Sequence, residues 1–196
     1  MSRFSVLGAT TLLLAVTPMV QAQTAPPLTT EQLIESAILP LPEELRPTAT
    51  VMGIGSAGTM VTLRKGTGSM TCLADDPGTA SFHVACYHQS MEPFMARGRE
   101  LRAQGVQGAQ VDTVRFAEVE AGKLPMPKDP ASLYSISGDG YDPATSEIKA
   151  GRRLYVVYVP FGTPESIGLP GVPVVGAPWI MFPGTPKAHI MFIPGM

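Results

Sequence analysis

The residues best suited to chemistry gather between the two cysteines of this 196-residue chain, Cys72 and Cys86. Between them lie the consecutive carboxylates Asp75 and Asp76 and the imidazole of His83. Carboxylate and imidazole groups bind divalent metal ions and exchange protons with substrates. This interval is therefore the first place in the sequence to look for a functional site.

Two further histidines could complete a metal site. One lies just beyond the second cysteine and the other near the end of the chain. Three imidazoles suit zinc or copper. However, Asp-Asp-Pro-Gly at 75–78 is also an ordinary turn sequence, and we expect no cofactor. The candidate ligands of a metal-dependent or hydrolytic enzyme are His83, His88, His189, Asp75 and Asp76.

The cysteines have two interpretations. In an exported protein two cysteines most simply form one disulfide, and closing a loop of this size contributes ~3 kcal/mol in the chain-entropy description. The alternative is a thiolate metal site, but the pair lacks the close Cys-x-x-Cys spacing typical of structural zinc. We predict a disulfide between Cys72 and Cys86, which leaves no free thiolate for catalysis.

Other signatures of catalysis or binding are weak. Residues 53–58 match the spacing G-x-G-x-x-G, but a strand pattern follows where a dinucleotide-binding motif needs a helix. No Gly-x-Ser-x-Gly motif is present. Trp179, Tyr155 and Tyr158 are candidates to line an apolar ligand pocket, although large aromatic residues usually pack in a core.

The N-terminus has the three parts of a secretory signal. Arg3 supplies a basic start, an apolar run covers 4–16, and Val20-Gln-Ala22 offers small residues for cleavage. We predict a signal peptide at 1–22 and a mature protein in the periplasm or extracellular space. No later apolar run has the ~20 residues that a transmembrane helix needs.

Composition narrows the class of partner. The chain has 14 basic and 16 acidic residues and no basic cluster, which argues against nucleic acid as a partner. Its 20 glycines and 20 prolines indicate short elements joined by turns, and 44% hydrophobic residues is too apolar for a disordered chain. We therefore expect a folded protein that binds a small ligand or another protein.

The elements that must position these residues can be placed by periodicity. Thr29 and Gln32 form a capping-box pattern that starts a short helix at 30–39. Alternating β-branched residues predict a meander of three strands at 50–54, 59–64 and 69–73.

The second half of the chain is harder to assign. A helix is expected at 90–104, the segment 111–119 fits either a strand or a short helix, and 124–150 has the composition of a surface loop with a possible short element at 132–136. A buried strand is expected at 153–159, followed by a long connection and a hairpin formed by 179–182 and 189–193.

Together these elements predict an α+β fold. We expect residues 23–47 to be a leader with one short helix, and residues 48–196 to form a single compact domain. Its antiparallel sheet would combine the meander, the 153–159 strand and the C-terminal hairpin, with the 90–104 helix packed on one face.

Two stretches of sequence resemble a group of signal-bearing bacterial proteins that have no assigned activity. One is the Cys-Leu-Ala-Asp-Asp-Pro block that leads to the second cysteine, and the other is the ending Gly-Thr-Pro-Lys-Ala-His-Ile-Met at 184–191. The resemblance implies a bacterial exported protein, and it transfers no catalytic residue.

The leading expectation is a non-enzymatic exported protein that binds a small ligand or a protein partner through the disulfide loop and the Pro/Gly-rich loops. Its binding site should be a concave, partly apolar pocket near Trp179 or the 160–178 connection. The alternative is the metal-dependent or hydrolytic enzyme described above.

Overall fold

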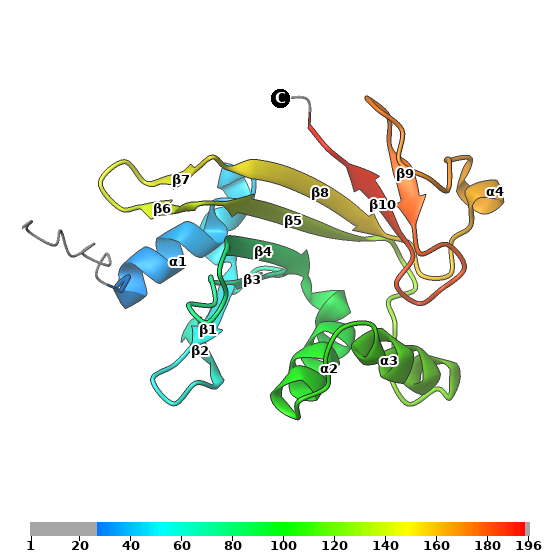
Figure 1. The fold of residues 1–196 in the computed structure, drawn as a ribbon, viewed down its shortest axis with the longest axis horizontal. Helices are drawn as coiled ribbons and strands as arrows, with labels where there is room; N and C mark the ends of the chain where they lie inside the picture. The colour runs from blue at the N-terminus through cyan, green and yellow to red at the C-terminus, as the bar shows by residue number, and fades with distance from the viewer. Residues whose placement is uncertain (1–26, 195–196) are drawn as a thin grey trace, which may run out of the picture.

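A computed structural model describes residues 27–194, so the predicted signal peptide at 1–22 lies outside the described residues. One eight-stranded sheet forms the centre, in the order β2-β1-β3-β4-β5-β8-β10-β9 (Figure 1). Most neighbouring strands are antiparallel, but β1 and β3 are parallel. The fold is therefore α+β with a mixed sheet, and the expectation of a purely antiparallel sheet was wrong.

The elements have the following bounds. The strands of the large sheet are β1 (Thr50–Ile54), β2 (Met60–Arg64), β3 (Met70–Leu73), β4 (Phe82–His88), β5 (Ala131–Gly138), β8 (Arg152–Tyr158), β9 (Trp179–Met181) and β10 (His189–Phe192). The other elements are α1 (Thr30–Ile38), α2 (Glu92–Ala103), α3 (Gln110–Glu120), α4 (Pro164–Ile167), the 3-10 turns η1 (Glu43–Thr48) and η2 (Gln89–Met91), and the hairpin of β6 (Gly140–Asp142) and β7 (Glu147–Lys149).

Helix α1 begins where the sequence predicts. The Thr29 hydroxyl accepts a hydrogen bond from the Gln32 backbone N–H at 3.3 Å, and the Gln32 side chain accepts one from the Thr29 N–H at 2.9 Å. These two bonds form the capping box and satisfy two N–H groups that the first turn leaves free. The capped helix packs its apolar side on the sheet, with Ala37 fully buried.

The β1–β2 hairpin is confirmed, but the third strand does not continue a meander. Strand β3 lies on the other side of β1, parallel to it, with Val51 opposite Cys72. Because strand alternation does not indicate which edge a strand joins, the parallel pairing was not visible in the sequence. The connection at 65–69 passes the start of β1 to reach that edge.

Glycine permits this close crossing. The backbone N–H groups of Thr67 and Gly68 both donate to the Thr48 carbonyl, at 3.0 and 2.8 Å. A Cβ atom on Gly66 would lie 2.2 Å from the Thr48 carbonyl oxygen and 2.4 Å from the carbonyl carbon of Ala49. Both contacts are with backbone, which cannot move aside as a side chain can.

We therefore expect Gly66→Ala to lower the free energy of unfolding by ~3 kcal/mol, at the upper end of overpacking costs. Gly78→Ala is the matched control, because its Cβ would meet only the Asp76 side chain at 3.1 Å. Chemical denaturation of both variants is the measurement. Equal stability of the two would show that the loop does not cross β1 in this way.

The composition of residues 124–150 predicted a surface loop, but the structure shows strands there. The segment contains β5, which pairs with β4 on one side and β8 on the other, and the β6–β7 hairpin. The possible short element at 132–136 is part of β5, but three serines and the surrounding Pro, Gly and Asp residues hid the full strand. The buried Ser135 faces Ala85 on one neighbour and Leu154 on the other, so a small residue occupies a position in the middle of the sheet.

The other expectations for the second half hold. The helix expected at 90–104 corresponds to η2 and α2. The segment 111–119, which fitted either a strand or a short helix, is helix α3. Strand β8 and the β9–β10 hairpin are present, although the long connection between them includes the short helix α4.

Helices cover the two faces of the sheet unequally. Helix α1 packs on one face near β1, β3 and β4, whereas α2 and α3 lie together under the opposite face (Figure 1). A cross-strand row on the α1 face runs from the disulfide toward the C-terminal hairpin and consists of Cys72, Cys86, Tyr134, Tyr155 and Phe192. The α1 end of this row is fully buried and the Phe192 end is exposed.

Candidate functional site

The acidic cluster in the disulfide loop forms a turn. The Asp76 carboxylate accepts a hydrogen bond from the Gly78 N–H at 2.8 Å, and the Asp75 carboxylate accepts one from the His83 backbone N–H at 2.7 Å. Partial burial raises the pKa of Asp75, although the bond from His83 opposes that effect. Both carboxylates therefore organise the loop between β3 and β4.

The three histidines lie apart. His83 and His88 are five residues apart on β4, so they point to opposite faces of the sheet, ~17 Å from each other along the strand. His189 is on β10, three strands away from β4. Between residues 27 and 194, no three His, Cys, Asp or Glu side chains are grouped to hold a metal ion.

His88 and His189 each form a hydrogen bond with a residue two positions away in the chain. The His88 Nδ1 accepts a hydrogen bond from the Ser90 N–H at 3.3 Å and caps η2. The His189 Nδ1–H donates to the Lys187 carbonyl at 2.7 Å, and burial lowers the pKa of His189. His189 is therefore neutral at pH 7, with its proton on Nδ1.

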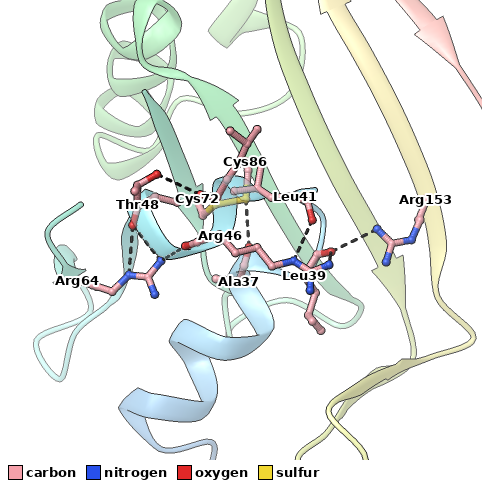
Figure 2. The surroundings of a disulfide bond; sticks show 11 residues. Ala37, Leu39, Leu41, Arg46, Thr48, Arg64, Cys72, Cys86 and Arg153 are labelled. Atoms are coloured by element: carbon pink, nitrogen blue, oxygen red, sulfur yellow. Dashed lines mark hydrogen bonds between the residues drawn. A yellow bond between two sulfur atoms is a disulfide. The ribbon is translucent and has the colours of Figure 1, made fainter. Parts of the chain in front are cut away.

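The predicted disulfide joins directly opposite residues of β3 and β4 (Figure 2). Both cysteines are fully buried, and the Cys86 sulfur lies 3.2 Å from the Ala37 carbonyl oxygen of α1. A disulfide sulfur carries no hydrogen, so this is a packing contact between helix and sheet. The bond is structural, because no solvent or partner reaches it.

Three arginines stabilise the irregular segment that covers this disulfide. Arg46 donates to the carbonyls of Leu41 at 2.9 Å and Leu39 at 3.2 Å, and Arg153 also donates to Leu39 (Figure 2). Arg64 donates to the carbonyls of Arg46 and Ala49, at 2.7 and 3.0 Å. These guanidinium groups donate to backbone carbonyls along the segment and so hold it in place.

A second polar cluster, the α3 clamp, joins helix α3 to the C-terminal hairpin. The Asp112 carboxylate accepts hydrogen bonds from Lys187, at 2.8 Å, and from Arg115. Arg115 is only 4% exposed, donates to the Phe94 carbonyl at 3.1 Å, and lies over the Phe94 ring. Sequence analysis missed this cluster because Asp112 and Lys187 are 75 residues apart in the chain.

Two candidate residues meet beside the α3 clamp. Tyr158 on β8 lies opposite His189 on β10, with 5.2 Å between the ring centroids. Burial raises the pKa of Tyr158 to about 12, so both rings are neutral at pH 7. Both side chains are buried, at 7% and 6% exposure, and we assign the pair to the core.

An apolar groove lies at the far end of the sheet. It has a volume of about 670 Å³ and lies where β9 begins and β10 ends. Figure 1 shows the two segments that flank it, the loop before β9 and the C-terminal end of β10, extending beyond the body of the sheet. The groove is lined by Pro173, Val174, Val175, Gly176, Ala177, Pro178, Trp179, Phe192, Ile193 and Pro194.

The sequence builds this groove from a turn and a strand end. Gly176 has a positive φ of 74°, which allows the turn that brings Val174 opposite Ala177. The Ile180 N–H donates to the Pro170 carbonyl at 2.9 Å and fixes the loop against β9. The loop therefore presents its valines beside the end of β10.

Of the three aromatic residues suggested by sequence, only Trp179 lines the groove. Its side chain is mostly buried, and its Nε1–H has no hydrogen-bond partner among the residues described. Tyr155 lies next to the groove, opposite Phe192, whereas Tyr158 is on the other face of the sheet. Sequence analysis missed Phe192 and Ile193, although one signal was available: residues 160–194 contain only two charged side chains, Glu165 and Lys187.

No described helix is long and apolar enough to span a bilayer. Comparisons of the chain with models of known families, with curated proteins and with solved structures find no match.

Proposed function

We propose that this is a non-enzymatic exported protein that binds a small apolar ligand in the groove beside Trp179. The observation that carries the proposal is the groove itself: its volume of about 670 Å³ falls within the range of small-molecule sites, and none of its ten lining residues has an ionisable side chain. The buried disulfide and the predicted signal peptide support export.

The alternative, a metal-dependent or hydrolytic enzyme, has less support. Catalytic groups must converge on one reacting atom, and His83, His88 and His189 lie on different faces or different strands. The carboxylates of Asp75 and Asp76 already accept backbone hydrogen bonds in a turn. The groove contains no histidine, carboxylate, serine or cysteine among its lining residues.

A fluorescent apolar probe tests the proposal. N-phenyl-1-naphthylamine, whose emission rises in apolar sites, is expected to bind the purified protein in the micromolar range. Ile193→Asp should weaken this binding at least tenfold, because it places a carboxylate in the groove at a side chain that is 62% exposed and adds little to folding.

Phe161→Asp is the matched control. Phe161 is also exposed, but its N–H donates to Thr185 in the β9–β10 turn, at the end of the hairpin away from the groove. Its positive φ of 63° is one that aspartate tolerates better than most residues. Loss of probe binding in both variants, or in neither, would contradict the assignment of the groove as the site.

A further inference from the structure

One edge of the large sheet is open. We propose that strand β2 pairs with β2 of a second copy of this chain, antiparallel to it and about a twofold axis at Val61. Strand β2 is the outermost strand on this side of the sheet, with β1 as its one neighbour (Figure 1). The pairing lies at the opposite edge of the sheet from the groove and needs no ligand there.

The turn of the β1–β2 hairpin determines which backbone groups of β2 point outward. The Gly55 N–H donates to the Thr59 carbonyl at 2.9 Å, so this is a hydrogen-bonded pair. Because hydrogen-bonded and non-hydrogen-bonded pairs alternate along an antiparallel ladder, Val61 bonds to β1 and its two neighbours face away. The N–H and C=O groups of Met60 and Thr62 therefore point to the open edge, where their backbones bond to no other segment of residues 27–194.

This edge lacks charged and proline residues. Sheets usually protect an edge strand with charged side chains or proline, but residues 53–63 contain neither. The one charged residue of β2, Arg64, is turned back into its own chain, where its guanidinium donates to the carbonyls of Arg46 and Ala49. An uncharged edge with unpaired backbone groups is a surface to which another strand can add.

The position of Val61 indicates that the added strand is a second β2. Its side chain is 38% exposed, and it is the only large hydrophobic residue exposed between residues 27 and 160. A twofold axis here places Met60 of each copy opposite Thr62 of the other, so the outward backbone groups bond to each other. The same axis brings the two Val61 side chains together in a non-hydrogen-bonded pair, where opposite side chains are closest.

The charges next to β2 are compatible with self-pairing. In this register Arg64 lies opposite Gly58 of the second copy, and Lys65 lies opposite Ala57. The basic residues of the two copies are therefore at opposite ends of the shared ladder, and no like charges face each other. Strand β2 has only five residues, so the interface is smaller than a standard one and we expect a weak dimer.

Sedimentation velocity measures this association. Between ~10 µM and ~1 mM protein, the range in which weak contacts form, the average mass should rise from that of the monomer toward that of the dimer. Val61→Lys should raise the dissociation constant at least tenfold, because it sets two ammonium groups against each other across the axis. Val172→Lys is the matched control and should dimerise like the wild type, since Val172 is 66% exposed and belongs neither to β2 nor to the groove lining.

A charge swap tests the register. Val61→Glu alone should dimerise as poorly as Val61→Lys, but an equimolar mixture of the two variants should form a mixed dimer. Only pairing about Val61 sets the two new side chains directly opposite each other. Thr62→Pro should prevent association and leave the hairpin intact, because it removes an N–H that points outward and not one that bonds to β1.

The contrary results are as definite. A wild type that stays monomeric at ~1 mM would overturn the pairing, as would a dimer that Val61→Lys leaves intact. Variants of opposite charge that do not associate when mixed would overturn the twofold axis at Val61. Association that Ile193→Asp removes and Val61→Lys does not would place the contact at the groove instead. None of these results bears on probe binding in the groove, which lies at the other edge of the sheet.

Discussion

Replacing Asp112 by alanine is expected to lower the free energy of unfolding by ~3 kcal/mol, the cost of leaving a buried charge without its partner. The Asp112 carboxylate binds both Arg115 and Lys187, so its loss leaves two cations facing each other. Arg115 cannot move into solvent, because its guanidinium lies against the Phe94 ring. Chemical denaturation at pH 7 is the measurement.

The loss of stability caused by Asp112→Ala should become smaller at low pH. Burial raises the pKa of Asp112, but hydrogen bonds from Lys187 and Arg115 outweigh it and hold the pKa below the ordinary value of 3.8. A carboxyl with a depressed folded-state pKa stabilises the protein above its unfolded-state pKa and stops doing so as the pH falls through the folded-state value. The difference between wild type and variant should therefore persist down to pH ~4 and shrink below it.

Glu120→Ala is the matched control, because Glu120 is an exposed acid on the same helix. Its removal should change stability by less than ~0.5 kcal/mol, as is usual for surface substitutions. If Asp112→Ala costs no more than this control, the α3 clamp does not attach the C-terminal hairpin to the helix.

Removing the disulfide with the double substitution Cys72→Ala and Cys86→Ala is expected to lower the free energy of unfolding by ~3 kcal/mol. The bond closes a loop across 14 residues, and its loss frees the unfolded chain while leaving the folded strands paired. Both sulfurs are also buried in the core beneath Ala37, so their removal leaves a small cavity.

The measurement is again chemical denaturation, with the wild type followed in parallel with and without reductant. Reductant should act on the wild type only after unfolding, because the bond is inaccessible in the folded protein. Rapid reduction of the native protein, or a double variant as stable as the wild type, would contradict the structural role of the bond.

Local signals predicted local structure. The capping box of Thr29 and Gln32, the β1–β2 hairpin and the disulfide all depend on residues close in sequence, and the structure contains each of them. The parallel pairing of β1 with β3 depends on the path of the 65–69 connection, which alternation does not specify. Strand β5 was anticipated only as a possible short element at 132–136, because Ser135 is a small polar residue in the middle of the sheet.

The groove was only half predictable. The sequence predicted a partly apolar pocket near Trp179 or the 160–178 connection, although a core position for Trp179 was the alternative. It did not point to Phe192 and Ile193, because their place in the lining depends on where β10 ends beside that loop. The α3 clamp was not predictable for the same reason: Asp112 and Lys187 meet only once the helix and the hairpin are docked.

The position of α1 over the disulfide imposes an order on how the chain matures. In the folded protein no oxidant can reach the sulfurs of Cys72 and Cys86, which lie beneath Ala37. Oxidation must therefore be complete before α1 docks, even though residues 30–38 precede both cysteines in the chain. Helix α1 is in this sense among the last elements to settle, and it seals a bond that must already have formed.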